Sequence, residues 1–388
     1  MVVEPKVRGF ICITAHPVGC KENVRKQIEY AKAQGKKENA PKKVLVIGSS
    51  TGYGLASRIS AAYIGGADTL GVCFEKESNG KRTATPGYYN TRAFEEFAKA
   101  DGLYAKTING DAFSKEIKDE VIETIKNDMG KVDMVIYSLA APRRTLADGT
   151  VAQSCLKTVG EPFSEKTWNV DNDTISQVTI EPATAEEVEG TVKVMGGEDW
   201  IDWIDALSAA GVLADNVTTV AYSYIGPELT YPIYNQGTIG KAKEDLYNSS
   251  VKINKKHGAT GVKAYISVNK ALVTQASSAI PIVPLYFAIL YKVMKEKNIH
   301  EGCIEQMCRL YTEKLYAGEV VTDDKGMVRL DDWEMREDVQ KAVMDIWPTV
   351  TTENLKDIAD TEGYHADFYR MFGFGIEGVD YTADVEIE

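Results

Sequence analysis

Residues 44–55 read VLVIGSSTGYGL, a strand-forming run that passes through three glycines into a helical pattern. Gly48 permits a tight turn, Gly52 lets backbone approach an anion, and Gly54 allows close packing of helix on strand. The N-terminus of a helix binds anions because its first backbone N–H groups have no partner within the helix. The stretch therefore predicts a dinucleotide-binding loop made of Gly48, Ser49, Ser50, Thr51, Gly52 and Tyr53.

Apolar runs of strand length alternate with amphipathic stretches of helix length along the chain. Besides 44–47, the expected strands cover residues 69–74, 103–108, 134–139, 218–224 and 262–268. The expected helices cover residues 55–62, 91–100, 115–127, 242–255, 284–296 and 304–315. This alternation predicts an α/β fold with a doubly wound, mostly parallel sheet of the Rossmann type, covered by helices on both faces.

Three segments lie outside this alternation. Residues 1–41 contain apolar and helical stretches and are expected to form an N-terminal cap. Residues 142–206 are polar and too long for a simple crossover, so they predict an insertion over the carboxyl edge of the sheet, where ligands bind. Residues 275–388 predict a helical lid and C-terminal extension, with a hairpin at 320–330 over the active site. We interpret residues 1–388 as a single domain.

Composition narrows the function classes. The net charge of −13 would repel a nucleic-acid backbone. The apolar run 279–291 is short and interrupted by Pro281 and Pro284, so it cannot span a bilayer as a helix. The first ten residues lack the apolar segment of a signal peptide, and the six cysteines form no Cys-x-x-Cys pair. We expect a cytoplasmic protein with free thiols, no metal, no membrane span and no nucleic-acid partner.

The ends of the next strands extend the expected cofactor path. Glu75 follows Phe74 at the end of the second strand, where a carboxylate can bind the adenosine ribose hydroxyls and repel a 2′-phosphate. This favours NADH, although three nearby basic residues keep NADPH open: Lys76, Lys81 and Arg82. The candidate contacts after the third and fourth strands are Asp111, Ala112, Leu139 and Ala140.

The fifth strand is not followed by the Tyr-x-x-x-Lys pair of short-chain carbonyl reductases. A pair of that spacing, Tyr291 with Lys295, lies in an amphipathic helix after the sixth strand, and we interpret it as a surface pair. The fifth strand is followed instead by Tyr234, Lys241 and Lys243. Glycines at 237 and 240 indicate that the helix begins after the tyrosine, so helical geometry does not choose between the two lysines.

A tyrosine and a lysine suit the reduction of an enoyl thioester. When hydride reaches the β-carbon, negative charge grows on the thioester oxygen, and a phenol can donate a hydrogen bond or a proton to it. A nearby ammonium lowers the pKa of the phenol and can hold the nicotinamide ribose. The alternatives from other classes are a short-chain ketone or alcohol oxidoreductase and a non-catalytic dinucleotide sensor.

Motifs spread over essentially all 388 residues support a family resemblance. Besides the glycine loop they are AHPxGC at 15–20, YSLA at 137–140, VMGGEDW at 194–200, AYSYIG at 221–226 and SVNKALVT at 267–274. The chain resembles the trans-2-enoyl-CoA reductase family, which is closely related to the single-chain bacterial enoyl-ACP reductases with a Tyr-x8-Lys motif. The resemblance implies a monomer that reduces the C2–C3 double bond of trans-2-enoyl-CoA with NADH, with enoyl-ACP as the alternative substrate.

The resemblance also implies roles that spacing leaves open. Tyr234 would be the proton donor, Lys243 the ligand of the nicotinamide ribose, and Tyr224 a contact of the substrate carbonyl. The nicotinamide end would touch Leu272, Val273 and Thr274. Residues 276–295 would lie over the active site, with acyl-pocket candidates Ile280, Ile282, Val283, Leu285 and Tyr286.

Two features of the resemblance carry alternatives. Arg143 and Arg144 are interpreted as solvated surface charges, with contact to coenzyme A phosphates as the alternative. Some members of the family have been described as flavin-dependent, but residues 275–388 supply no second glycine phosphate loop. We therefore expect no flavin.

Overall fold

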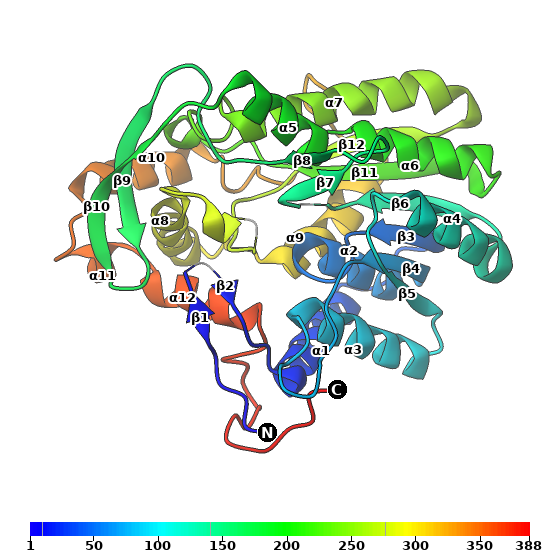
Figure 1. The fold of residues 1–388 in the computed structure, drawn as a ribbon, viewed down its shortest axis with the longest axis horizontal. Helices are drawn as coiled ribbons and strands as arrows, with labels where there is room; N and C mark the ends of the chain where they lie inside the picture. Colours follow the sequence, from blue (N-terminus) through cyan, green and yellow to red (C-terminus); the bar gives the residue numbers. More distant parts are fainter. Residues whose placement is uncertain (10, 140, 276) are drawn as a thin grey trace.

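A computed structural model describes residues 1–9, 11–139, 141–275 and 277–388. Its centre is a seven-stranded sheet in the order β13-β12-β11-β6-β3-β4-β5, and every described pairing within it is parallel. The labels β12 to β5 follow this order from top to bottom in Figure 1. The strands are β3 Lys43–Ile47, β4 Asp68–Cys73, β5 Ala105–Asn109, β6 Val132–Tyr137, β11 Leu213–Ser223, β12 Lys263–Val268 and β13 Val328–Arg329.

Helices cover both faces of this sheet, because the buried strands are apolar on both sides. Val44 and Val46 of β3 pack into one core, whereas Leu45 and Ile47 pack into the other. The first core holds α1 Pro17–Ala33, α2 Gly52–Tyr63, α3 Pro86–Ala100 and α9 Cys303–Arg309. The second holds α4 Lys115–Thr124, α6 Glu198–Ala209 and α7 Thr238–His257. The predicted doubly wound Rossmann-type fold and its six strands are confirmed.

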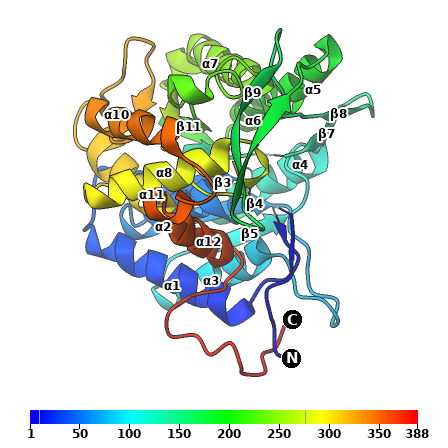
Figure 2. The ribbon, with the colours of Figure 1, turned by 90° about the vertical axis from the view of Figure 1, so that its left-hand side faces the viewer.

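A third core covers the carboxyl ends of the strands. In this core, residues that follow β11 and β12 pack against a group of helices that we call the lid. The lid comprises α8 Val283–Glu296, α10 Glu337–Ile346, α11 Leu355–Ile358 and α12 Thr361–Arg370. All four lid helices face the viewer in Figure 2.

The insertion contains strands that its polar sequence conceals. β7 Arg143–Thr145 pairs with β8 Val151–Gln153, and β9 Phe163–Asn169 pairs with β10 Thr174–Ile180, before α5 Ala185–Met195. The longer hairpin lies beside the lid in Figures 1 and 2. The Lys166 ammonium donates to the backbone oxygen of Pro348 at 2.7 Å, so the insertion and the C-terminal extension are joined there.

The hairpin expected at 320–330 has a different structure. Asp323 and Gly326 make a turn in which the Asp323 N–H donates to the Met327 oxygen at 2.9 Å. The second arm is β13, which pairs in parallel with β12 at the edge of the central sheet. The turn chemistry was predicted correctly, but the first arm is not a strand and the second extends the main sheet.

The two ends of the chain meet beside α1. The amino group of Met1 donates to the Val385 oxygen at 2.8 Å, and N and C lie close together in Figures 1 and 2. A β-carbon at Gly19 would lie 1.7 Å from the Gly373 oxygen, so the start of α1 packs directly on the C-terminal tail. Among the described residues, no helix is both long enough and apolar enough to cross a membrane.

Candidate active site

The glycine loop has the geometry that its sequence predicts. Gly48 has φ +83°, and a β-carbon there would lie 2.0 Å from the Ser138 oxygen. A β-carbon at Gly54 would lie 1.8 Å from the Gly48 oxygen. Thr51 caps α2 without a side-chain hydrogen bond to the helix. The first N–H groups of α2 are therefore not capped by that side chain and can meet an anion.

A cleft of about 500 Å³ lies beside this loop. Thr51 and Gly52 form part of one wall, and residues 272–275 line it as well. Its remaining lining comes from α1, α2, α3, α9, α12 and the C-terminal tail. The cleft thus brings together two segments that sequence reasoning had assigned separately to the cofactor.

Hydrogen bonds hold Glu75, the candidate contact of the adenosine ribose. The Ser50 hydroxyl donates to the Glu75 carboxylate at 2.6 Å, and the Asn109 side chain bonds both backbone groups of Glu75, at 2.8 and 2.9 Å. Phe74 is 78% exposed, which leaves its ring available to a ligand. The candidate carboxylate is therefore fixed beside the phosphate loop.

The remaining adenine-side candidates occupy the ends of β5 and β6. The Asp111 carboxylate accepts from the Phe113 N–H at 3.0 Å, and the Ala112 oxygen accepts from the Trp203 indole at 3.1 Å. Leu139 is half-buried directly after β6. Ala140 lies outside the described residues.

The structure separates the two candidate lysines. Lys241 is exposed and pairs with Glu244 at 3.1 Å. The Lys243 ammonium turns inward and donates to the Tyr222 oxygen at 3.0 Å, at the end of β11. Burial lowers the pKa of Lys243 to about 8.

Tyr234 and Tyr224 pack against each other below the lid. Their ring centroids lie 4.7 Å apart in an edge-on arrangement, and Tyr234 is 8% exposed. Its hydroxyl has no hydrogen-bond partner among the described residues. Burial, with a smaller contribution from Glu334, raises the pKa of Tyr234 above its usual range. The expected lowering by a nearby ammonium is therefore wrong in this structure, because burial dominates.

The nicotinamide candidates are fixed by neighbouring side chains. The Val273 N–H donates to the Tyr291 hydroxyl at 3.0 Å, and the Ser277 hydroxyl donates to the Leu272 oxygen at 2.7 Å. Tyr291 is fully buried, so its interpretation as part of a surface pair with Lys295 is wrong. The amphipathic pattern did not reveal this burial, because α8 packs against α10, α12 and β9 and most of its residues are buried.

The acyl-pocket candidates all belong to the core beneath the lid. The buried set is Ile280, Ile282, Val283, Leu285 and Tyr286. Ile282 has φ +72°, a conformation that costs energy for a β-branched residue, at the point where α8 begins.

The two arginines after β6 have different surroundings. Arg143 is exposed, as expected for a solvated charge. Arg144 is buried and pairs with Glu198 at 2.9 Å and with Asp202 at 3.5 Å. The interpretation of Arg144 as a solvated charge is wrong, because α6 supplies carboxylates that the linear sequence does not place beside it.

Sequence reasoning missed Gln306 and Glu334, two buried polar residues that bond to predicted site residues. The Tyr53 hydroxyl donates to the Lys270 oxygen at 2.7 Å and accepts from the Gln306 amide at 2.9 Å. Glu334 accepts hydrogen bonds from Tyr224 and Tyr286. The acidic run around position 334 was the one signal that could have drawn attention to Glu334, and an acidic run more often forms a solvated surface.

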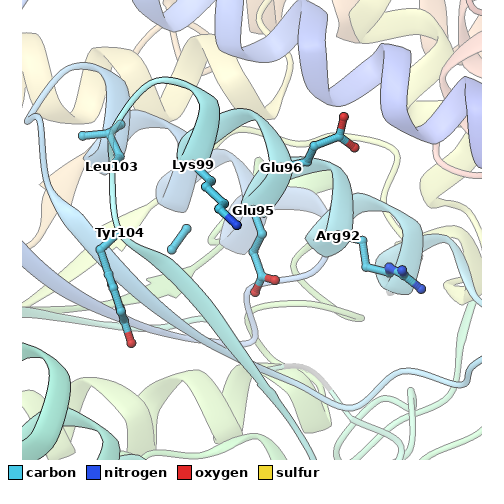
Figure 3. Close-up of a pocket in the computed structure, with 7 residues that line it drawn as sticks. Arg92, Glu95, Glu96, Lys99, Leu103 and Tyr104 are labelled. Carbon is cyan, nitrogen blue, oxygen red and sulfur yellow. The ribbon is translucent and has the colours of Figure 1, made fainter.

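A second hollow, of about 390 Å³, lies outside this site. It is lined by α3 and the start of β5 (Figure 3), with Arg92, Glu95, Glu96, Lys99, Leu103, Tyr104 and Ala105 around it. None of the predicted site residues lines it, so it plays no part in the site.

Three family descriptions match the chain. They are the NAD(P)H binding domain of trans-2-enoyl-CoA reductase over residues 2–80, the trans-2-enoyl-CoA reductase catalytic region over residues 82–316, and an enoyl reductase FAD binding domain over residues 322–385.

Individual relatives match from end to end. A trans-2-enoyl-CoA reductase [NADH] of Clostridium perfringens is 58% identical and covers 100% of this chain and 99% of its own. An enoyl-[acyl-carrier-protein] reductase [NADH] of Serratia proteamaculans is 54% identical, with coverages of 100% and 98%. The crystal structure of a Treponema denticola trans-2-enoyl-CoA reductase in complex with NAD has a TM-score of 0.96 and 51% identity, with coverages of 99% and 98%.

Such agreement along the whole chain includes the glycine loop, the lid and the C-terminal extension. The class is therefore that of NADH-dependent oxidoreductases built on a sheet of the short-chain-dehydrogenase type. Within this class, the chain belongs to the trans-2-enoyl-CoA reductase family.

The segment that matches the FAD description does not fit a flavin dinucleotide. Two of its helix N-termini already carry carboxylates: Asp360 caps α12, and Glu337 and Asp338 lie in the first turn of α10. These charges would repel phosphates where a dinucleotide needs them held. Within the described part of the chain, no group of three or more His, Cys, Asp or Glu residues could hold a metal ion.

Proposed function

We propose that this chain reduces the C2–C3 double bond of trans-2-enoyl-CoA with NADH, and that Tyr234 donates to the thioester oxygen. The observation that carries the proposal is Tyr234: its side chain is nearly buried beside Tyr224, and its hydroxyl has no hydrogen-bond partner among the described residues. Such a hydroxyl can meet a substrate oxygen without breaking an existing bond.

Tyr234 and Lys243 have separate roles in the proposed reaction. NADH supplies the hydride that forms the new bond at C3. The raised pKa of Tyr234 keeps its phenol protonated at neutral pH, so it can give a hydrogen bond or proton to the oxygen where charge develops. The Lys243 ammonium reaches the end of β11, where it would hold the nicotinamide ribose. A proton from water must then reach C2, and any proton that Tyr234 gave to the oxygen returns as the carbonyl re-forms, so the reaction consumes one hydride and one proton overall.

The cofactor contacts follow the ends of the strands. The N–H groups at the start of α2 would hold the pyrophosphate, and Glu75 would accept from the adenosine ribose hydroxyls. Tyr224 would lie at the substrate carbonyl, and residues 272–274 at the nicotinamide. The buried candidates at the start of α8 would line the acyl pocket, closed by the lid.

The acyl carrier has two candidates. Coenzyme A is our first choice, because a carrier protein is acidic and this chain has a net charge of −13. Acyl carrier protein is the second, because a 54% identical relative is named for it. We further propose that the protein is a cytoplasmic monomer that does not bind nucleic acid.

A direct comparison of substrates tests this proposal. We expect NADH oxidation with crotonyl-CoA, a smaller kcat/KM with crotonyl-ACP, and a lower kcat/KM with NADPH. The Tyr234→Phe variant should lose about a hundredfold or more in kcat and still bind NADH, because general-acid groups contribute on that order. Turnover of the carrier-protein ester alone would reverse the choice of carrier, and an unchanged kcat in the variant would remove Tyr234 as the donor.

A further inference from the structure

A buried carboxylate from the C-terminal extension reaches the tyrosines of the candidate active site. Glu334 follows β13 and has no exposed surface. One carboxylate oxygen accepts from the Tyr224 hydroxyl at 3.0 Å and from the Tyr286 hydroxyl at 2.7 Å. The other oxygen accepts from the Ala271 N–H at 2.7 Å. Three donors converge on the group, an arrangement that satisfies an ionised carboxylate.

Holding a carboxylate at this buried position is energetically costly. Burial raises the pKa of Glu334, and the charge of Lys270, followed by the hydrogen bonds from Ala271 and Tyr286, opposes that rise. Burial also lowers the pKa of Lys270 to about 8, so this cation is itself poorly solvated. Desolvated charges cost stability, and they concentrate at functional sites.

We propose, resting on the enoyl-thioester reduction proposed above, that Glu334 is a positioning residue that holds the Tyr224 phenol against the donor Tyr234. The tether fixes the Tyr224 ring, and that ring packs edge-on against Tyr234 at 4.7 Å. Because the Tyr224 proton is directed to Glu334, Tyr224 does not donate to the thioester oxygen while the tether lasts. Tyr234 is left as the donor, and Tyr224 lies beside the substrate through its ring.

The same carboxylate joins the substrate side of the site to the cofactor side. Ala271, which donates to it, directly precedes the segment Leu272–Thr274 proposed at the nicotinamide. Tyr286, the third donor, belongs to the lid helix α8. One side chain therefore links the ends of β11 and β12 to the lid. This is a role for the extension that involves no flavin.

The substitution that tests this is Glu334→Gln. The amide oxygen of the glutamine can still accept from the Ala271 N–H. Its NH2 group turns toward the phenols and reverses the direction of their hydrogen bonds. We expect kcat with crotonyl-CoA to fall about tenfold, because a hydrogen bond to a charged group is lost. The KM for NADH should stay within about twofold of the parent value, because the Ala271 contact survives.

A Tyr224→Phe background distinguishes the loss of Tyr224 positioning from a general disturbance of the structure. In Tyr224→Phe the tether is already absent, so adding Glu334→Gln should lower kcat by less than about twofold. Asp331→Asn is the matched control, since Asp331 is a fully buried carboxylate near Glu334 whose partner is Arg329. It should leave kcat close to the parent value. A tenfold loss from Glu334→Gln in both backgrounds, or from the control, would overturn the proposal.

Carbon-13 NMR tests the contact between Glu334 and Tyr224 without any enzymatic turnover. With tyrosine labelled by carbon-13 at the ζ position, the Tyr224 resonance is assigned by its loss in Tyr224→Phe. It should shift in Glu334→Gln and stay in place in Asp331→Asn; a resonance that does not move would overturn the proposal. Failure of the parent enzyme to reduce crotonyl-CoA would instead count against the proposed coenzyme A reaction, and the resonance would still test the tether.

Discussion

At the scale of single residues, burial sets the protonation of the two groups assigned to catalysis. It raises the pKa of Tyr234, so the phenol is protonated throughout the neutral range. It lowers the pKa of Lys243 to about 8, so the ammonium is only moderately stable at neutral pH. The same desolvation therefore favours the donor form of the tyrosine and disfavours the charged form of the lysine.

Replacing Lys243 by methionine should stabilise the protein at the expense of activity. The folded pKa lies below the ordinary value of 10.5, so protonation of Lys243 costs folding energy fully below pH 8, and the cost disappears as pH rises toward 10.5. We expect Lys243→Met to gain about 2 kcal/mol at pH 7 and less at pH 9.5. Chemical denaturation at both pH values measures this, and an equal gain at both would contradict the assignment.

Glu75 should control the choice between NADH and NADPH. Glu75→Gln removes the charge that would repel a 2′-phosphate while keeping the bond from Ser50, so we expect kcat/KM for NADPH to rise about tenfold relative to NADH. Glu77→Gln, an exposed acid two residues along, is the control and should leave the ratio unchanged. A constant ratio in Glu75→Gln would show that cofactor choice lies elsewhere.

At the scale of elements, the glycine loop is the feature least tolerant of change. Gly54→Ala would place a methyl group 1.8 Å from the Gly48 oxygen and push α2 away from β3. We expect NADH affinity to fall at least about tenfold, measured by fluorescence titration. Gly258→Ala is a matched control, because its β-carbon meets open space and its φ of −61° suits alanine. Normal affinity in Gly54→Ala would contradict the close packing described.

The sequence predicted those elements that carry an apolar pattern. Five of the six predicted strands, β3, β4, β6, β11 and β12, have buried runs, and the glycine spacing placed the phosphate loop correctly. The hairpin β9–β10 was missed because its strands are polar and largely solvent-accessible, so apolar and polar residues do not alternate clearly. β13 was missed as a strand of the main sheet because two residues are too few to show such an alternation. Spacing alone could not separate Lys243 from Lys241; the family resemblance selected Lys243, and tertiary contacts distinguish the two lysines. The tether from Glu334 to Tyr224 joins residues 110 positions apart.

At the scale of the whole molecule, the lid and the two chain ends close around one edge of the sheet. The motif at 15–20 packs on the C-terminal tail, and the cleft beside the phosphate loop is lined by both α1 and that tail. The extension is therefore part of the wall of the cleft beside the phosphate loop, and through Glu334 it also reaches Tyr224.

Damage at the junction of the chain ends should lower stability without changing the chemistry. Gly19→Ala would set a β-carbon 1.7 Å from the Gly373 oxygen, an overpacking that we expect to cost about 2 kcal/mol. Val18→Ala, at a half-exposed neighbouring position, should cost much less. Calorimetry compares their Tm values, and equal Tm values would show that the tail is not packed on α1 in solution.

The most direct test of the central claim follows the hydride itself. With NADH deuterated at the transferred position of nicotinamide C4 and crotonyl-CoA in ordinary water, one deuterium should appear at C3 of the product and none at C2. That result establishes transfer from NADH to the β-carbon without an exchangeable carrier. Product without deuterium at C3 would mean that the hydride passes through a group that exchanges with water, and it would contradict direct transfer between cofactor and substrate.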